Sequence, residues 1–173
     1  KPGQAWHQDE FYIPTRDRSL AGGWIALDDA TIENGCLWVL PGSHKQGLRD
    51  HHHDGLFYGA IDPDLLAIDQ AKTAVGPPGT VTLHHPFTVH GSGHNRSDAL
   101  RRILFYEYAA ADAWPLFYGV DWPEYEARLL RGQSCNTPRF EPLPVKMPHP
   151  TPAAGTGKIY AQQRQFAKKY FTA

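Results

Sequence analysis

Three side chains with metal-binding donors stand out in the sequence: His7 and Asp9 in a His-Gln-Asp triplet, and His90 far downstream. In an extended segment residues i and i+2 point to the same face, so His7 and Asp9 could hold one cation while Gln8 points elsewhere. Two imidazoles and one carboxylate cover one face of an octahedron and leave three positions open, as in non-haem Fe(II) oxygenases and unlike closed structural zinc sites. The pattern predicts that His7, Asp9 and His90 are metal ligands and form a catalytic centre.

The context of His90 strengthens this prediction, because a His-Gln-Asp triplet alone is also compatible with a metal-free surface. A β-rich run over residues 79–90 ends at His90, a loop of Gly, Ser and Asn follows, and a second strand starts at Arg101. If the two strands are antiparallel neighbours, Arg101 lies close to the metal end of His90. A guanidinium there could bind a carboxylate through two hydrogen bonds.

Several further motifs accompany these residues in a fixed order. They are Trp-Ile-Ala-Leu-Asp-Asp at 24–29, Glu-Asn-Gly-Cys-Leu at 33–37, Pro-Gly-Ser-His-Lys at 41–45, and His-Gly-Ser-Gly at 90–93 with Asn95, Ser97 and Arg101. Together they resemble the phytanoyl-CoA dioxygenase family of Fe(II)/2-oxoglutarate-dependent oxygenases, from about residue 4 to residue 108. The resemblance implies that the metal is Fe(II) and that 2-oxoglutarate and O2 are cosubstrates.

The resemblance also implies roles for residues around the metal. Arg101, eleven residues after His90, would pair with the distal carboxylate of 2-oxoglutarate, and its neighbour Arg102 would point to the opposite strand face. Ser92, Gln8 and Trp24 match positions that line the cosubstrate pocket. For Trp24 the alternative is a core aromatic residue, and for Ser92 it is a hydroxyl that forms a turn.

The implied fold is mainly β: a double-stranded β-helix (jelly roll, cupin-like) with a few flanking helices. Family members carry a substantial segment before the metal-binding triplet, so we expect that the N-terminal part is missing here. The chain would then be a fragment, come from a truncated source, or receive strands from another chain. The implied reaction is hydroxylation of an unactivated C–H bond of a small organic molecule, with release of succinate and CO2. Because Asp9 is present, hydroxylation is favoured over halogenation. The alternatives are a cupin-like metal-binding enzyme that does not use 2-oxoglutarate and a truncated, non-catalytic binding module.

Composition fits a single domain over residues 1–173, with a core at about 1–110 and C-terminal helices and a Pro-rich strap at 111–173. The chain has 41% hydrophobic residues and a net charge of −1, which indicates no nucleic-acid or membrane partner. The two cysteines, Cys36 and Cys135, give no disulfide framework, and a cytoplasmic location is predicted. The expected partner is a small-molecule substrate, and no oligomeric state is predicted.

Local patterns predict several elements. Strands are expected at 21–28 and 36–40 on either side of an Asn34-Gly35 hairpin turn. Capped helices are expected after Asp62 and after Asp121, the second one ending near Gly132. Further expectations are a solvated loop at 51–53, a Pro-rich surface strap at 138–156 and a docked helix at 158–170. His84 shares the strand parity of His90, so it could contact cosubstrate or substrate, or be a satisfied core histidine.

Overall fold

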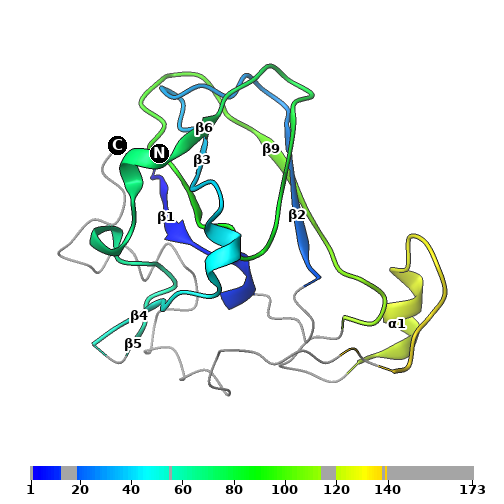
Figure 1. Cartoon of the computed structure of the whole chain (residues 1–173). Helices are drawn as coiled ribbons and strands as arrows, with labels where there is room; N and C mark the ends of the chain where they lie inside the picture. Colours follow the sequence, from blue (N-terminus) through cyan, green and yellow to red (C-terminus); the bar gives the residue numbers. More distant parts are fainter. Residues whose placement is uncertain (1, 13–18, 55, 114–119, 138, 140–173) are drawn as a thin grey trace.

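The computed structural model describes residues 2–12, 19–54, 56–113, 120–137 and 139. Within these ranges the fold is mainly β, as expected, with two antiparallel sheets and a two-stranded ribbon. The strands are β1 (Gln4–His7), β2 (Ala21–Ala26), β3 (Leu37–Val39), β4 (His52–His53), β5 (Leu56–Phe57), β6 (Lys72–Ala74), β7 (Val81–His84), β8 (His90–Ser92) and β9 (Ile103–Tyr108). Figure 1 shows β2 and β9 side by side, across the molecule from β1, β3 and β6.

The first sheet has the strand order β1-β8-β3-β6. In this sheet His7 of β1 is paired with His90 of β8, and Gln4 is paired with Ser92. All three residues of β8 are buried, because β1 and β3 cover both of its edges. The pairing brings two histidines that are 83 positions apart in the sequence onto adjacent strands.

The second sheet has the order β7-β2-β9 and forms the other layer. Gly22 of β2 is paired with His84 on one side and with Glu107 on the other. Two residues along, Trp24 is paired with Phe105, and alternation of side chains puts it on the same face as Gly22. The opposite face carries exposed apolar side chains, which are those of Val81, Leu83, Leu104, Tyr106 and Tyr108.

The strands predicted at 21–28 and 36–40 correspond to β2 and β3, but the predicted hairpin between them is wrong. The two strands belong to different sheets, so the turn carries the chain from one layer to the other. Thr31 and Asn34 close this turn through reciprocal hydrogen bonds between the backbone N–H of each and the side-chain oxygen of the other. Gly35 takes a φ of 83°, whereas Asn34 keeps a negative φ. The turn predicted at Asn34-Gly35 is present, but not with the positive φ at both residues that a two-residue hairpin turn needs. A turn does not by itself select which strands pair.

The expected pairing of the His90 strand with the strand after Arg101 is also wrong. β8 pairs with β1 and β3, whereas β9 pairs with β2 in the second sheet. The loop between them therefore crosses between the sheets. Arg101 reaches the inner side from the second layer, and its position is set by contacts with residues of the 31–35 turn and β2.

A small apolar cluster supports the strand end that carries the metal-binding triplet. It consists of the buried residues Trp6, Leu40, Ile61 and Val89. The backbone N–H of Ile61 donates to the carbonyl of Trp6 at 2.7 Å, which ties the cluster to β1. Close packing of this kind restricts the backbone next to His7.

Helices are short in the described part of the chain. There are four 3-10 helices, at Asp9–Phe11, Ser43–Gln46, Pro63–Leu65 and Ile68–Gln70, and one α-helix, α1 (Trp122–Ala127). The predicted caps are confirmed, since Asp62 accepts from the N–H of Asp64 and Asp121 from that of Glu124. The second helix ends at Ala127, before Gly132, which takes a φ of 91° in the following loop.

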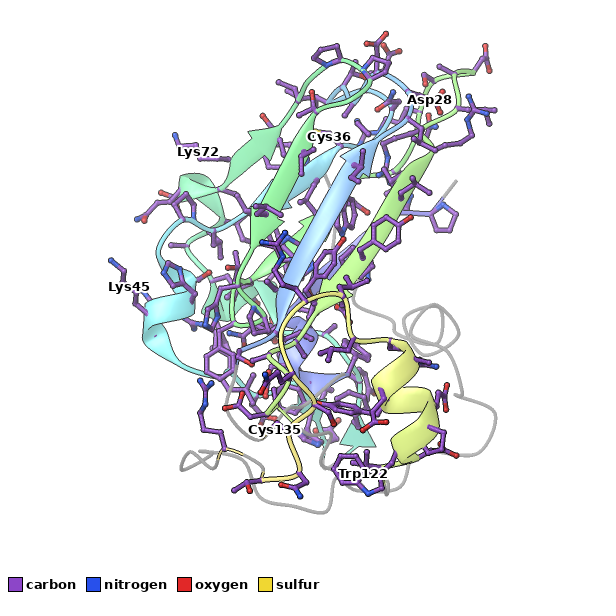
Figure 2. All side chains as sticks on the ribbon, turned by 90° about the vertical axis from the view of Figure 1, so that its right-hand side faces the viewer. Asp28, Cys36, Lys45, Lys72, Trp122 and Cys135 are labelled. Carbon is purple, nitrogen blue, oxygen red and sulfur yellow. The ribbon has the colours of Figure 1, made fainter. Side chains whose placement is uncertain are left out.

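Figure 2 shows Trp122 of α1 at the opposite end of the molecule from Asp28, which follows β2. The predicted helix at 158–170 and, apart from Arg139, the predicted strap at 138–156 lie outside the described residues. Among the helices that can be described, none has the length and apolar composition that crossing a bilayer would need.

Candidate metal centre

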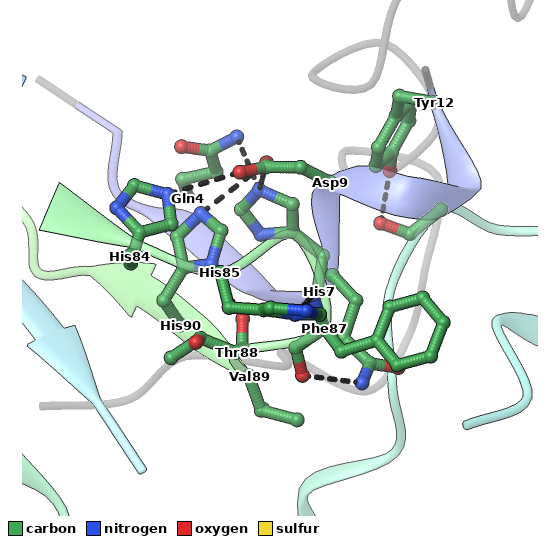
Figure 3. A network of polar contacts seen from close by, with 12 residues as sticks. Gln4, His7, Asp9, Tyr12, His84, His85, Phe87, Thr88, Val89 and His90 are labelled. Carbon is green, nitrogen blue, oxygen red and sulfur yellow. Dashed lines mark hydrogen bonds and ion pairs between the residues drawn. The ribbon is translucent and has the colours of Figure 1, made fainter. Parts of the chain in front are cut away.

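The side chains of His7, Asp9 and His90 converge on one buried point. One donor atom from each residue lies within 4.8 Å of the other two. The Oδ1 atom of Asp9 is 3.6 Å from Nε2 of His7 and 3.4 Å from Nε2 of His90. Figure 3 shows the two imidazoles and the carboxylate facing one another. The three residues that the sequence singled out thus come together in space.

The backbone explains how the triplet presents two ligands on one side. His7 is the last residue of β1, Gln8 is extended (φ −127°, ψ 133°), and Asp9 starts a 3-10 helix. Gln8 therefore continues the strand alternation for one more residue, after which the chain turns. This keeps His7 and Asp9 on the same side, while the side chain of Gln8 leaves in the other direction.

The two histidines present the same ring nitrogen to the site. Nδ1 of His7 donates to the carbonyl of Ala5 at 2.8 Å, and Nδ1 of His90 donates to the carbonyl of Thr88 at 2.8 Å. A donor proton on Nδ1 leaves Nε2 with a lone pair, which is the form that binds a metal. The backbone thus selects the tautomer at both positions.

The charges also suit a cation. Burial opposes ionisation of Asp9, but the hydrogen bond with His84 and the nearby imidazoles of His7 and His90 hold the pKa of Asp9 well below its usual range. Burial, with a contribution from His7, lowers the pKa of His90 to about 3, so this ring is neutral at pH 7. One carboxylate and two imidazoles on one side are the donor set of a facial Fe(II) site, so these residues fit the metal.

Gln8 is buried and its amide bridges three backbone groups. Its Nε2 donates to the carbonyls of Gly47 (2.9 Å) and Phe87 (2.6 Å), and its Oε1 accepts from the N–H of Arg49 (2.8 Å). These bonds hold the loops around the metal-binding triplet. A role of Gln8 in binding the cosubstrate stays a prediction.

The prediction of a solvated loop at 51–53 is wrong for His51, which is completely buried. Its Nδ1 donates to the carbonyl of Arg49, and its Nε2 accepts the backbone N–H of Gln8 at 2.9 Å. Burial lowers the pKa of His51 to about 3. His51 is therefore neutral and holds the backbone of Gln8, the residue between His7 and Asp9. The run of three histidines in the sequence did not predict this role.

Two further residues reach the cluster. Nε2 of His84 lies 3.0 Å from Oδ2 of Asp9, and the side-chain amide of Gln4 donates to Nε2 of His7 at 3.1 Å. His84 is buried, but the prediction that it continues the strand of His90 is wrong, because the two residues lie on β7 and β8 in different sheets. No local pattern predicted its contact with Asp9. On a regular strand Gln4 and His7 would point to opposite faces, but the pairing of β1 with β8 is irregular between them. The sequence therefore did not predict this contact.

Trp24 and Arg101 lie together beside the inner face of the second sheet. The guanidinium carbon of Arg101 is 5.9 Å from the centre of the Trp24 ring, and its Nε donates to the carbonyl of Asn34 at 3.3 Å. The indole Nε1 of Trp24 is buried and has no hydrogen-bond partner among the described residues. The indole N–H and the guanidinium can therefore both donate to an anionic group.

Arg102 has a different environment, as the strand parity predicted. Its guanidinium makes two hydrogen bonds to Asp28, at 2.7 and 3.0 Å, on the exposed surface. Hydrogen bonds from Arg102 lower the pKa of Asp28 to about 2. Ser92 lies on β8, where its hydroxyl accepts the backbone N–H of Gln4 at 3.1 Å.

Glu107 adds an acidic group on the same face of the second sheet. One of its carboxylate oxygens, Oε1, is buried without a hydrogen-bond partner in the described part of the chain. Burial, with a smaller contribution from the charge of Asp9, raises the pKa of Glu107 to about 7. Nothing in the sequence distinguished this glutamate from a surface residue of a strand.

Two imidazoles and a carboxylate on one side of a mainly β fold define the class of mononuclear non-haem iron enzymes. The sequence profile of the phytanoyl-CoA dioxygenase family matches residues 1–103. The chain belongs to this family, and the cofactor and cosubstrate of the family are Fe(II) and 2-oxoglutarate.

Individual relatives agree with this assignment. The chain is 42% identical to a probable alpha-ketoglutarate-dependent hypophosphite dioxygenase of Stutzerimonas stutzeri, over 96% of the chain and 60% of that protein. It is 57% identical to a phytanoyl-CoA dioxygenase of Arabidopsis thaliana, over 61% of the chain and 38% of that protein. Among solved structures it resembles the non-haem monooxygenase ThoJ in its apo form, with a TM-score of 0.56 and 30% identity. That match covers 65% of the chain and 42% of ThoJ. The chain thus spans between 38% and 60% of the length of these relatives.

Proposed function

We propose that this chain carries the catalytic centre of an Fe(II)- and 2-oxoglutarate-dependent dioxygenase, with His7, Asp9 and His90 as iron ligands. The observation that carries this proposal is the convergence of one carboxylate oxygen and two Nε2 atoms on a single buried point. We also propose that the two sheets form the double-stranded β-helix of this enzyme class. The resemblance to ThoJ supports that fold.

When bound, Fe(II) supplies the activation of O2 and the oxidative decarboxylation of 2-oxoglutarate. The protein's share is to hold the reactants. Arg101 binds the distal carboxylate of 2-oxoglutarate, and Trp24 supports it with its ring face and its indole N–H. Ser92 and Gln8 complete the cosubstrate pocket, in the case of Gln8 by fixing the loops that surround it. Burial of all three metal ligands excludes water from the reacting atoms.

The proposed reaction inserts one oxygen atom of O2 into a bond between hydrogen and carbon or phosphorus. The other oxygen atom enters succinate, and the carboxyl carbon of 2-oxoglutarate leaves as CO2. The balance is substrate–H, O2 and 2-oxoglutarate giving substrate–OH, succinate and CO2. The hydroxylation of an unactivated C–H bond in a small organic molecule is one case of this reaction.

For the substrate, the relatives suggest two compounds to test. The similarity to a hypophosphite dioxygenase extends over 96% of the chain, whereas the similarity to the Arabidopsis phytanoyl-CoA dioxygenase covers 61%. The polar groups of His84 and Glu107 near the metal ligands suit a compact, polar substrate better than an alkyl chain. We therefore propose hypophosphite as the first substrate to assay and phytanoyl-CoA as the second, with succinate as the product measured in both cases.

The site itself is tested by an anaerobic titration of the metal-free chain with Fe(II) and then 2-oxoglutarate, following the visible charge-transfer band of the chelate. We expect the band in the wild type and no band in His90→Ala. Arg101→Ala should weaken 2-oxoglutarate binding roughly 10–100-fold, because the variant loses hydrogen bonds to a charged carboxylate. Arg102→Ala is the matched control, because Arg102 is paired with Asp28 on the surface and should leave binding unchanged.

Other results would favour the alternatives. Fe(II) binding without a band would favour a cupin-like enzyme that does not use 2-oxoglutarate. Failure of the wild-type chain to bind either ligand would favour a non-catalytic module.

A further inference from the structure

The two carboxylate oxygens of Asp9 have different partners. Oδ1 faces Nε2 of His7 at 3.6 Å and Nε2 of His90 at 3.4 Å. Oδ2 instead lies 3.0 Å from Nε2 of His84, which is outside the cluster of three converging donors. Figure 3 shows His84 on the side of Asp9 away from Tyr12, joined to the carboxylate by a dashed line. One oxygen thus faces the metal ligands and the other is engaged by a fourth side chain.

The direction of this hydrogen bond follows from the charge of Asp9. An ionised carboxylate can only accept, so the proton of the bond belongs to Nε2 of His84. A ring nitrogen that donates its proton to Asp9 has no lone pair to offer a metal. His84 is therefore placed to act on Asp9 and not as a fourth ligand.

The orientation of the His84 ring is fixed by packing. His84 is opposite Gly22 on the neighbouring strand, and a Cβ atom at Gly22 would lie only 2.6 Å from its Nε2. The ring is also nearly parallel to that of Phe105, with 3° between the planes and 6.3 Å between the centres. Its Nδ1 is buried and has no hydrogen-bond partner among the described residues. The ring of His90 is nearer still, with 4.7 Å between the ring centres. The His84 ring is thus held among the backbone of Gly22, the rings of His90 and Phe105, and the carboxylate of Asp9.

We propose that His84 is a positioning residue that holds Asp9 as a ligand through Oδ1 alone. This inference rests on the proposed function, because it concerns the same metal site. A carboxylate that bound through both oxygens would occupy one more coordination position. By engaging Oδ2, His84 keeps three positions open, two for 2-oxoglutarate and one for O2.

The test uses the full chain with Co(II), whose visible spectrum reports the number and type of ligands. In His84→Gln the side-chain amide can still donate to Oδ2 from about the place of Nε2, whereas His84→Leu has no donor. We expect His84→Gln to keep the wild-type spectrum and a Kd within about 3-fold. We expect His84→Leu to change the spectrum and to weaken Co(II) binding roughly 10–100-fold, as is typical when the partner of a metal ligand is lost. If His84→Leu does not fold, His84→Asn serves the same purpose, because its shorter amide stops short of Asp9.

A second readout is the affinity of the Fe(II) form for 2-oxoglutarate at saturating metal, measured by the chelate band. A loss of affinity in His84→Leu that His84→Gln restores supports the inference. Equal spectra and equal affinities in wild type and His84→Leu would overturn it and leave the metal site intact. An equal loss in His84→Gln and His84→Leu would also overturn it, since the ring itself would then be the required group. A wild-type chain that binds no Co(II) would overturn the proposed function, and this inference with it.

Discussion

The imidazole of His84 lies directly over the backbone of Gly22, in the middle strand of the second sheet. A Cβ atom at Gly22 would be 2.6 Å from Nε2 and 2.8 Å from Cε1 of this ring, far inside van der Waals contact. The same Nε2 is bonded to Asp9. The absence of a side chain at one strand position therefore allows a histidine on the next strand to reach a metal ligand.

The first prediction concerns this contact. Gly22→Ala should displace the His84 ring, destabilise the fold by about 1–3 kcal/mol as overpacking does, and weaken Co(II) binding. Gly23→Ala is the matched control: it is the next residue on the same strand, and its Cβ would meet Leu83 at an ordinary 3.5 Å. Urea unfolding and Co(II) titration of both variants check this. Equal metal affinity in Gly22→Ala and Gly23→Ala would show that the site tolerates a shifted His84.

The second prediction concerns Gln8. Gln8→Ala removes the partner of two carbonyls and one N–H that surround the metal-binding triplet. We expect a loss of roughly 2–5 kcal/mol in the free energy of unfolding, because buried polar groups are left unpaired. The exposed Gln70 provides the control, and Gln70→Ala should be close to neutral. If Gln8 also contacts the cosubstrate, the folded variant will show a lower affinity for 2-oxoglutarate at saturating metal.

The third prediction concerns the pH dependence of stability in the metal-free chain. Burial lowers the pKa of His51 to about 3 in the fold, whereas an unfolded histidine has a pKa of about 6.5. Between these values the unfolded chain binds the additional proton, so the contribution of His51 is fully present above pH 6.5 and is lost as the pH falls towards 3. His51→Gln keeps an acceptor for the N–H of Gln8 but does not titrate. The His51→Gln variant should therefore reduce the slope of the free energy of unfolding against pH by up to about 1.4 kcal/mol per pH unit.

Urea unfolding between pH 4.5 and 7.5 in the presence of a chelator measures this slope. His53→Gln is the control, because the side chain of His53 is half-exposed. A slope for His51→Gln equal to that of the wild type would mean that His51 is protonated in the folded protein.

The fourth prediction concerns Glu107, whose pKa is raised to about 7 by burial and by the charge of Asp9. The folded state binds the proton of Glu107 more tightly than the unfolded state does. The contribution of Glu107 to the free energy of unfolding is therefore fully present below its unfolded pKa of about 4.3 and is lost as the pH rises through 7. Glu107→Gln should therefore gain stability relative to the wild type between pH 4.5 and 8. We expect on the order of 1–2 kcal/mol, a discounted figure because Glu107 is only partly buried.

Unfolding of Glu107→Gln at pH 5 and pH 8, beside the exposed control Glu126→Gln, tests this. A bound divalent cation offsets the charge of Asp9, so saturating Co(II) should reduce the gain in part. A gain that does not change with pH would mean that the carboxyl of Glu107 does not titrate in this range.

The features that depend on local chemistry could be predicted from the amino-acid sequence. The placement of His7 and Asp9 on one side follows from strand alternation, because the two residues are two positions apart and Gln8 is extended between them. The caps at Asp62 and Asp121 and the positive φ of Gly35 are likewise decided by a few adjacent residues. Parity of neighbouring residues also predicted that Arg101 and Arg102 point in different directions. The parity argument for His84 does not hold, because His84 and His90 lie on β7 and β8 in different sheets.

Which strands are neighbours, and therefore which side chains meet, depends on the folded domain as a whole. β2 and β3 are consecutive in the chain but lie in different sheets, as do β8 and β9. The contact of His51 with Gln8 spans 43 positions and that of His84 with Asp9 spans 75. Alternation fixes the face of a side chain but not the partner of its strand, because pairing depends on burial and packing across the whole domain. For that reason the proposed iron ligands could be predicted from the sequence, whereas the residues that hold them in place could not.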